Sequence, residues 1–110
     1  MTATDVVVVL TTFPADRDPD QLATTLVEER LAACVNVFAA MRSIYVWKGG
    51  LETADERQLV IKTTRARVDE LKVRLIALHP YELPEILVLP VIDGLDRYLS
   101  WVVESTRKTV

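Results

Sequence analysis

The sequence is poor in the residue types that staple small secreted proteins or build metal centres. Among 110 residues it has one cysteine, Cys34, and one histidine, His79. A lone cysteine excludes a disulfide within the chain and fits a reducing compartment. A single histidine does not make a metal site, because zinc centres use three or four protein ligands. The chain is therefore neither a disulfide framework nor a histidine-rich metal protein.

Long apolar runs and an excess of basic charge are also absent. The apolar run Val6–Leu10 falls far short of the roughly 20 residues that span a bilayer. The start, Met1–Asp5, lacks the basic and apolar regions of an export signal. Acidic residues outnumber basic ones by 16 to 13, and the basic residues are scattered. We expect a cytoplasmic protein without a membrane or nucleic-acid partner.

Apolar residues make up half of the chain, which is enough for a core of its own. A length of 110 residues predicts one domain, residues 1–110. The β-branched run Val6–Leu10 indicates a first strand, which is expected to end at Thr11–Pro14. Asp18 and Pro19 match a helix N-cap and first helical position, and the apolar spacing behind them predicts a helix over residues 19–32.

The middle of the chain predicts an unusually long hairpin. One strand is expected over 35–47 with an irregularity near Arg42–Ser43, Gly49-Gly50 marks the turn, and a second strand follows over 51–63. At roughly 3.3 Å per residue each strand reaches about 43 Å, whereas a domain of this size has a diameter of about 34 Å. The overhanging end carries the apolar side chains Tyr45, Val46, Trp47 and Leu51. Such an edge must be covered, so the pattern predicts an obligate oligomer.

Three further elements complete the chain: a helix over 66–78, a strand over 85–90 and a helix that begins at Gly94. The order β-α-β-β-α-β plus a C-terminal helix predicts the α+β class and, within it, the ferredoxin-like split β-α-β fold. No Gly-rich phosphate loop, CxxC, HExxH or serine elbow is present. An acylphosphatase-like hydrolase would need backbone donors where Pro14 stands. We therefore do not expect an enzyme.

Two residues are candidate metal ligands. His79 could bind a metal or transfer protons, or it could cap the last carbonyls of the helix before it. Cys34 could be a soft ligand for Cu(I), or it could be a small buried apolar residue. Both interpretations are open for both residues.

Charged and aromatic residues suggest a pocket between subunits. Lys62 interrupts an apolar strand, and Glu82 and Glu85 lie in the segment after the second helix. They either form a Lys–Glu ion pair between subunits or line, with Tyr81, a pocket for an anionic or zwitterionic ligand. Trp47 either stacks on a ligand or anchors a subunit interface.

Five sequence motifs cover most of the chain from the first helix onward. They are ERLAACVN at 29–36, YVWKG at 45–49, KTT at 62–64, HPYELPE at 79–85 and YLSW at 98–101. In this order and at this spacing they resemble the CutA divalent-ion-tolerance family. The resemblance implies a homotrimer of ferredoxin-like protomers whose long hairpins extend the sheets of their neighbours. It also implies a link to divalent-cation tolerance, copper above all, and an architectural kinship with PII signalling trimers.

The resemblance further implies where copper would bind. The family's copper ligands are a cysteine that closes the first strand and two consecutive histidines before the Pro-Tyr pair. Those positions hold Thr11, and Leu78 followed by His79, in this sequence. Only His79 matches, because Thr11 and Leu78 are poor copper ligands. The metal candidates are therefore His79 and Cys34.

Two functions follow as hypotheses. In the first, a trimeric CutA-like protein is linked to divalent metal (copper) tolerance or response by binding a metal or a small ligand. The alternative is a PII-like trimeric small-molecule sensor or scaffold without a physiological metal. Its inter-subunit pocket would be lined by Trp47, Lys62, Tyr81, Glu82 and Glu85.

Overall fold

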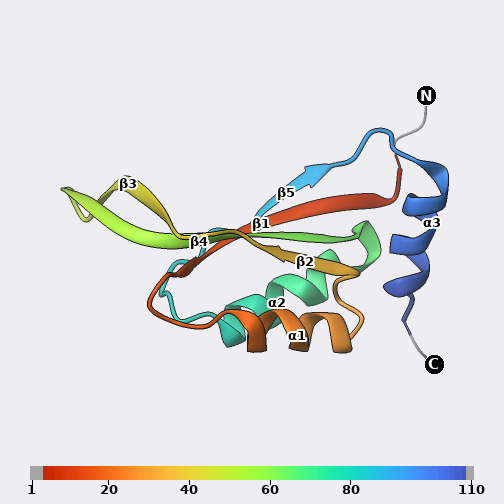
Figure 1. The fold of residues 1–110 in the computed structure, drawn as a ribbon, viewed down its shortest axis with the longest axis horizontal. Coiled ribbons are helices and arrows are strands. Elements are labelled where there is room, and N and C mark those ends of the chain that lie inside the picture. Colours follow the sequence, from red (N-terminus) through yellow and green to blue (C-terminus); the bar gives the residue numbers. More distant parts are fainter. Residues whose placement is uncertain (1–3, 109–110) are drawn as a thin grey trace.

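A computed structural model describes residues 4–108 of the chain and has the expected α+β ferredoxin-like fold with a C-terminal helix (Figure 1). Its elements are β1 (Val6–Pro14), α1 (Asp20–Glu28), β2 (Cys34–Val37), β3 (Met41–Trp47), β4 (Gly50–Thr64), the 3₁₀ turn η1 (Arg65–Arg67), α2 (Val68–Leu78), β5 (Leu87–Pro90) and α3 (Asp96–Ser105). No helix among these residues is long and apolar enough to span a membrane.

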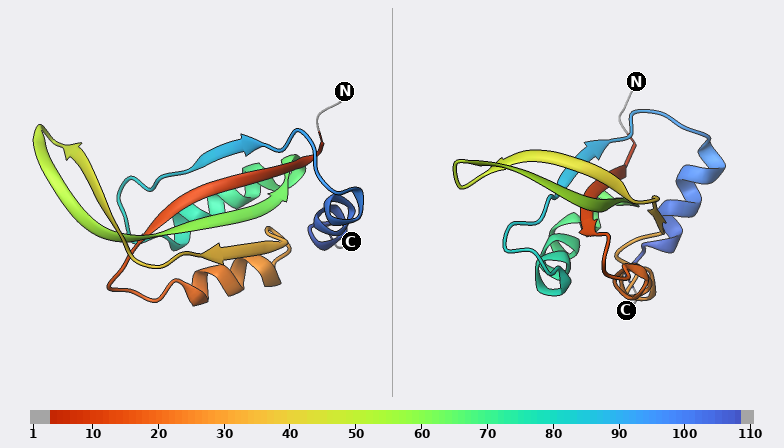
Figure 2. Two further views of the ribbon diagram at one scale, coloured as in Figure 1. Left: turned by 45° about the horizontal axis from the view of Figure 1, so that its top comes forward. Right: turned by 60° about the vertical axis from the view of Figure 1, so that its left-hand side comes forward.

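The strands form one antiparallel sheet in the order β2-β4-β1-β5, and β3 pairs with the outer half of β4. Helices α1 and α2 lie together on one face of this sheet (Figures 1 and 2). Helix α3 packs at one end of the other face, where Val6, Ala33 and Val102 form a small second cluster. The rest of that second face, called the open face below, carries no helix from the described part of the chain.

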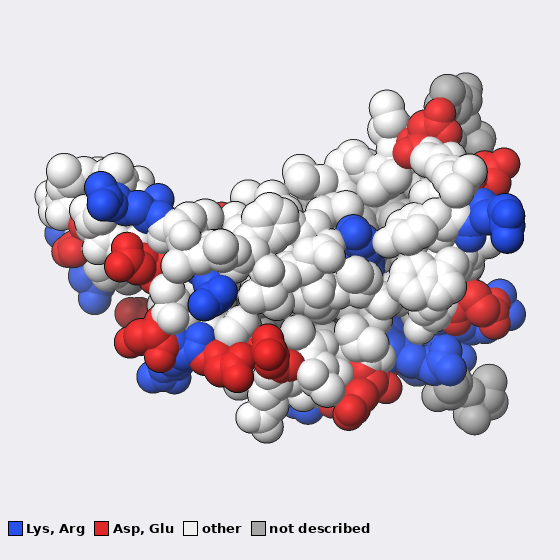
Figure 3. Space-filling model, viewed as in Figure 1, with Lys and Arg blue, Asp and Glu red and all other residues white. Residues whose placement is uncertain are grey.

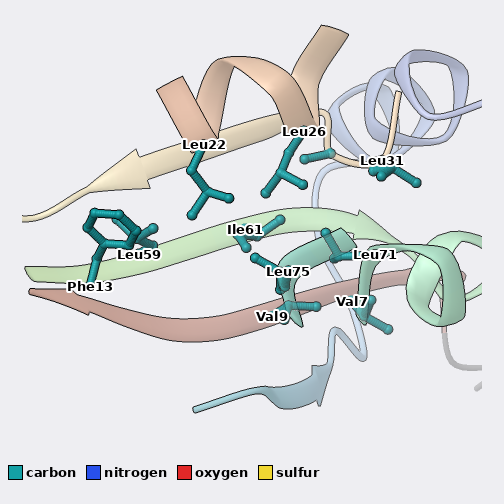
Figure 4. Close-up of a cluster of buried hydrophobic side chains, with 11 residues drawn as sticks. Val7, Val9, Phe13, Leu22, Leu26, Leu31, Leu59, Ile61, Leu71 and Leu75 are labelled. Carbon is teal, nitrogen blue, oxygen red and sulfur yellow. The ribbon is translucent and has the colours of Figure 1, made fainter. Parts of the chain in front are cut away.

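The main core lies between the sheet and the helices α1 and α2 (Figure 4). Alternate residues of each strand point towards the helices because successive strand side chains face opposite sides of a sheet. The core side chains are Val7, Val9, Phe13, Leu59 and Ile61 from the strands, and Leu22, Leu26, Leu71 and Leu75 from the helices. All of them are buried, and each large apolar side chain contributes roughly 1.5–3 kcal/mol by leaving water.

The long hairpin is confirmed: β3 and the outer half of β4 project beyond the rest of the molecule (Figure 1). Its turn has positive φ at both central residues, Lys48 (50°) and Gly49 (80°), which matches the twist of the strands that it joins. The irregularity is not at Arg42–Ser43, as expected, but at 38–40, between β2 and β3. The chain leaves the ladder there, so the predicted first strand is two strands in succession.

The predicted end of the first helix was wrong. Helix α1 ends at Glu28 and not at residue 32, because Arg30 takes a left-handed conformation with φ of 60°. The N–H of Leu31 then donates to the carbonyl of Leu26 at 2.9 Å, which turns the chain back towards the core. A left-handed arginine is uncommon, and apolar spacing alone does not reveal it.

Other boundaries moved by a few residues. Strand β1 is an exception and ends at Pro14, within the expected stretch, because β4 is long enough to pair with it as far as Glu56. Strand β5 begins at Leu87 instead of 85, and α3 begins at Asp96 instead of 94. The Asp18 carboxylate accepts the N–H of Asp20 at 2.8 Å, as expected for a residue that starts a helix.

The open face and the hairpin expose many large apolar side chains. Leu51 and Val46 at the hairpin end are 76% and 68% exposed, and Leu87 and Leu89 on β5 are about half exposed. Figure 3 shows a broad surface with few charged side chains between the hairpin and α3. Exposed apolar surface of this extent is typical of a surface that another molecule covers.

Candidate functional site

A cavity of about 690 Å³ lies where the hairpin leaves the body of the protein. Its volume falls within the range of small-molecule sites, roughly 300–1,000 Å³. Its walls are Thr12 of β1, Tyr45 and Trp47 of β3, Glu56 of β4, and Pro80, Tyr81, Glu82, Leu83, Pro84, Glu85, Ile86 and Leu87 of the segment that leads into β5. Strands from the hairpin and the connection after α2 thus meet around one space.

Strand register brings the aromatic and acidic walls to the same side. Tyr45 and Trp47 are two residues apart on β3 and therefore face the same way. Glu56 faces with them, because β3 and β4 are paired from Met41↔Glu56 to Trp47↔Gly50. Thr12 joins this side through its pairing with Gln58, two residues along β4. All of them belong to the open face.

The segment after α2 is fixed against the hairpin base by Tyr81. Its hydroxyl donates to the Glu56 carboxylate at 2.7 Å. Burial, together with the hydrogen bond to the Glu56 carboxylate and its charge, raises the pKa of Tyr81 well above its ordinary value. Tyr81 is therefore a neutral donor at physiological pH, and it holds an almost fully buried carboxylate in place.

His79 is buried beside the cavity and its ring is held on both sides. Its Nε2 lies 2.6 Å from the carbonyl of Thr12, and the N–H of Tyr81 donates to its Nδ1 at 3.1 Å. A carbonyl only accepts and an amide N–H only donates, so these contacts assign the proton to Nε2. The ring also packs on Phe13 and Tyr81. His79 thus links β1 to the cavity segment, and its ring does not bond the last carbonyls of α2.

Glu85 is held by a second link between the segment and the sheet. Gln58 donates from Nε2 to the Glu85 carboxylate at 3.1 Å and to the carbonyl of Thr11 at 2.8 Å. With the Tyr81–Glu56 bond, this contact fixes both ends of the cavity segment on β4. The walls are therefore built by specific hydrogen bonds as well as by apolar contact.

Within one chain, four of the five residues predicted for an inter-subunit pocket lie together and one lies apart. Trp47, Tyr81, Glu82 and Glu85 all line the cavity. Lys62 faces the same side of the sheet but is six residues from Glu56 along β4, which is about 20 Å. Its ammonium lies 5.9 Å from the ring centroid of Tyr98 on α3 instead.

The two predicted metal ligands lie at different places. Cys34 is a free, half-buried cysteine that pairs with Lys62 at the start of β2. His79 bonds to Thr12, whose β4 partner Gln58 is four residues, or about 13 Å, from Lys62. No group of three or more histidine, cysteine or acidic side chains that could hold a metal ion occurs among residues 4–108. Within one chain, Cys34 and His79 therefore do not converge on one ion.

Three polar or aromatic walls of the cavity, Tyr45, Thr12 and Glu56, were not among the predicted pocket residues. Tyr45 could have been found, because it alternates with Trp47 on a predicted strand and must share its face. Thr12 could not, because its place depends on how far β1 continues along β4. Glu56 required the same knowledge of the register.

Comparison with known proteins gives consistent results. Residues 7–105 match the family model described as "CutA1 divalent ion tolerance protein". The chain is 46% identical over 99 residues to the divalent-cation tolerance protein CutA of Thermus thermophilus, covering 90% of this chain and 96% of that protein. The solved structure of the divalent cation tolerance protein Cut A1 from Thermus thermophilus superposes with a TM-score of 0.89 at 45% identity, covering 93% of this chain and 99% of that one.

More distant structures have the same fold. The PII-like protein CutA from Nostoc, in apo form, is 36% identical with a TM-score of 0.85, covering 94% of this chain and 99% of that one. A protein from Archaeoglobus fulgidus described as the periplasmic divalent cation tolerance protein CutA is 31% identical, with a TM-score of 0.88 and coverage of 93% and 99%. The whole elongated fold, hairpin included, is therefore shared.

Proposed function

Since the chain belongs to the CutA1 divalent ion tolerance family, whose members are tolerance and PII-like proteins and not enzymes, we propose that it is a homotrimeric small-ligand sensor or scaffold. The ligand would bind in the cavity at the hairpin base. The observation that carries this proposal is the cavity of about 690 Å³, with aromatic walls and carboxylates fixed by hydrogen bonds. Concave sites with apolar walls and a few oriented polar groups are typical of ligand binding.

The exposed apolar side chains support assembly. Leu51, Val46, Leu87 and Leu89 would cost free energy if left in water, and the outer edge of β5 offers unpaired backbone groups. When further copies of the same chain cover these surfaces, the apolar side chains leave water and the backbone groups at the edge of β5 can pair. The copy number of three follows the family resemblance. In such a trimer Tyr45 and Trp47, at the projecting end, would place the cavity near a subunit boundary.

A screen of metabolites by thermal shift tests ligand binding. A compound that binds the folded trimer and not the unfolded chain raises the melting temperature by linkage. We expect at least one such compound, and we expect Trp47→Leu to abolish its effect. If no compound shifts the melting temperature while metals do, the sensor proposal is wrong.

Metal binding is the second candidate function. The family description favours it, and Cys34 offers a free thiol on the open face, a soft ligand suited to Cu(I). Because Cys34 and His79 lie apart within one chain, a shared ion would need ligands from another copy. Titration calorimetry with Cu(I), Cu(II) and Zn(II) on the wild type, Cys34→Ser and His79→Ala tests this. Binding that neither variant weakens would exclude both residues.

The expected compartment is the cytoplasm, supported by the single free cysteine. Cell fractionation with an antibody against the chain would test this, since export to a periplasm or an organelle would contradict it.

A further inference from the structure

The cavity has an unbalanced charge. Its walls, as formed by the described residues, include three carboxylates, Glu56, Glu82 and Glu85, and no lysine or arginine. The ion pairs between residues 4 and 108 use Glu29, Asp69, Glu70 and Glu104. None of the three cavity carboxylates therefore has a basic partner within the described chain.

Of the three carboxylates, Glu56 is the most deeply buried and therefore the most costly to leave without a cation. It is 7% exposed, and the Tyr81 hydroxyl donates to it. A carboxylate taken out of water is costly unless a cation or several donors replace the lost solvent. One phenol provides a single hydrogen bond and no positive charge. A cation in the cavity would supply the missing charge.

The aromatic walls favour the same kind of ligand. Tyr45, Trp47 and Tyr81 line the cavity, and aromatic faces attract cations within roughly 6 Å of the ring centroid. The Trp47 ring already attracts one cation, because the ammonium of Lys48 lies 5.6 Å from its centroid. An anion would instead meet three carboxylates, and the Lys62 of the same chain is about 20 Å from Glu56 along β4.

We propose that this cavity binds an organic cation, an alkylated ammonium or related amine with an apolar body. This inference rests on the proposed ligand-binding function and narrows it to one chemical class. The positive centre lies between the aromatic rings and the carboxylates of Glu82 and Glu85, and the apolar body lies against Leu83 and Ile86. The anionic or zwitterionic ligand expected from the sequence depended on Lys62, which is not a wall of the cavity within one chain.

The direct test compares two probes of the same shape. Choline carries a permanent positive charge, and 3,3-dimethylbutan-1-ol is its neutral isostere. Both are titrated at fixed ionic strength into the ¹⁵N-labelled full chain, with succinate as an anionic probe. The two indole signals, from Trp47 and Trp101, are separated with a Trp101→Phe variant. We expect choline to shift the Trp47 signal with an affinity at least about tenfold higher than that of the isostere.

Charge-removing variants provide the second readout. Glu82→Gln and Glu85→Gln are expected to weaken choline binding by about three- to tenfold each and to leave binding of the isostere unchanged. Glu28→Gln, which removes an exposed charge from α1, is the matched control and should change neither. The oligomer mass of every variant is checked by light scattering, so that a loss of assembly is not mistaken for a loss of ligand.

Three outcomes overturn the proposal. Equal shifts by choline and its isostere, or a shift by succinate alone, would mean a neutral or anionic ligand and would leave ligand binding itself intact. If choline at millimolar concentration does not shift the Trp47 signal, organic cations are also excluded as the ligand class. Only a thermal-shift screen without hits of any charge would overturn the proposed sensor function as well.

Discussion

Both faces of the sheet carry large apolar residues, but helices bury those on one face and leave many on the other face exposed. On the helix side, Val7, Val9 and Ile61 are buried beneath Leu26 and Leu75. On the open face, Leu87 and Leu89 of β5 remain exposed. On the projecting hairpin, Ile44, Val46 and Leu51 are exposed as well, on the side opposite to Tyr45 and Trp47. The first face has the packing of a finished core. The second carries exposed apolar side chains, and apart from α3 at one end it has no covering layer from residues 4–108.

The covered face therefore stabilises the fold of the protomer, whereas the open face carries its candidate function. The covered face accounts for the stability of one chain, and its buried residues Val7, Val9, Ile61, Leu26 and Leu75 do not line the candidate cavity. The open face carries the candidate cavity, the unpaired carboxylates and the surface for other copies. Changes on the two faces should therefore affect different measurements.

The largest expected effect is on assembly. Leu89→Glu places a charge on the open face of β5 and should convert the oligomer to single chains of 12.4 kDa, because an unpaired charge is not tolerated in a buried interface. Val73→Glu, at a more exposed apolar position on α2, should leave the mass unchanged. Light scattering after size exclusion measures both. An unchanged mass for Leu89→Glu would mean that this part of β5 is not an interface.

The next effect is on the stability of the protomer. Leu75→Ala opens a cavity in the main core and should lower the free energy of unfolding by about 2–5 kcal/mol. Its neighbour Ile76 is 62% exposed, so Ile76→Ala should change the free energy of unfolding by no more than about 0.5 kcal/mol. Urea denaturation at one protein concentration measures both. Equal losses of unfolding free energy in the two variants would contradict the contrast between buried and exposed apolar side chains.

A smaller effect is expected at the cavity. Tyr81→Phe removes the donor to the buried Glu56 carboxylate and should cost about 1–3 kcal/mol. Tyr98→Phe is the control, because the exposed Tyr98 ring keeps its contact with Lys62 after the change. If both variants lose the same stability, the Tyr81–Glu56 bond does not hold the cavity segment.

The stability difference between the wild type and Tyr81→Phe should also depend on pH. The pKa of Tyr81 is raised in the folded state, so its contribution is complete below the unfolded value of about 10 and is lost as pH rises above it. The difference between the two proteins should therefore shrink between about pH 9 and 11. A difference that stays constant over this range would show that Tyr81 titrates normally.

The smallest effect is expected at an exposed ion pair between the helices. Arg74 donates to the Glu29 carboxylate at 2.8 and 2.9 Å, and this hydrogen bond lowers the pKa of Glu29. In Arg74→Gln we expect this pKa to return towards its ordinary value, measured by NMR titration, with no change in unfolding beyond error. A clear loss of stability would mean that this pair, and not burial, holds the helix layer.

Most of the fold could be predicted because local patterns repeat along it. Apolar spacing located the helices, and the paired glycines Gly49 and Gly50 located the hairpin. The end of α1 could not be predicted, because Arg30 adopts a left-handed conformation, which is uncommon for a residue other than glycine. The break at 38–40 was misplaced for a related reason: strand alternation does not show where a strand leaves its partner.

The candidate site was predicted in part. The motif from His79 to Glu85 and the aromatic Trp47 were recognised as neighbours. Lys62 lies apart from them within one chain, because alternation tells which face a residue shares and not how far along the strand it lies, and its place in a pocket between subunits stays a prediction. Distance along β4 separates Lys62 from Glu56, and the cavity walls within one chain therefore favour a cationic ligand over the anionic one.

The central claim is that further copies of this chain cover the open face and complete the site. Native mass spectrometry of the wild-type chain at micromolar concentration tests it most directly. The account predicts a single species of three times 12.4 kDa, with no folded monomer. A folded monomer as the main species would contradict it, because the exposed side chains of β5 and the hairpin would then be stable in water.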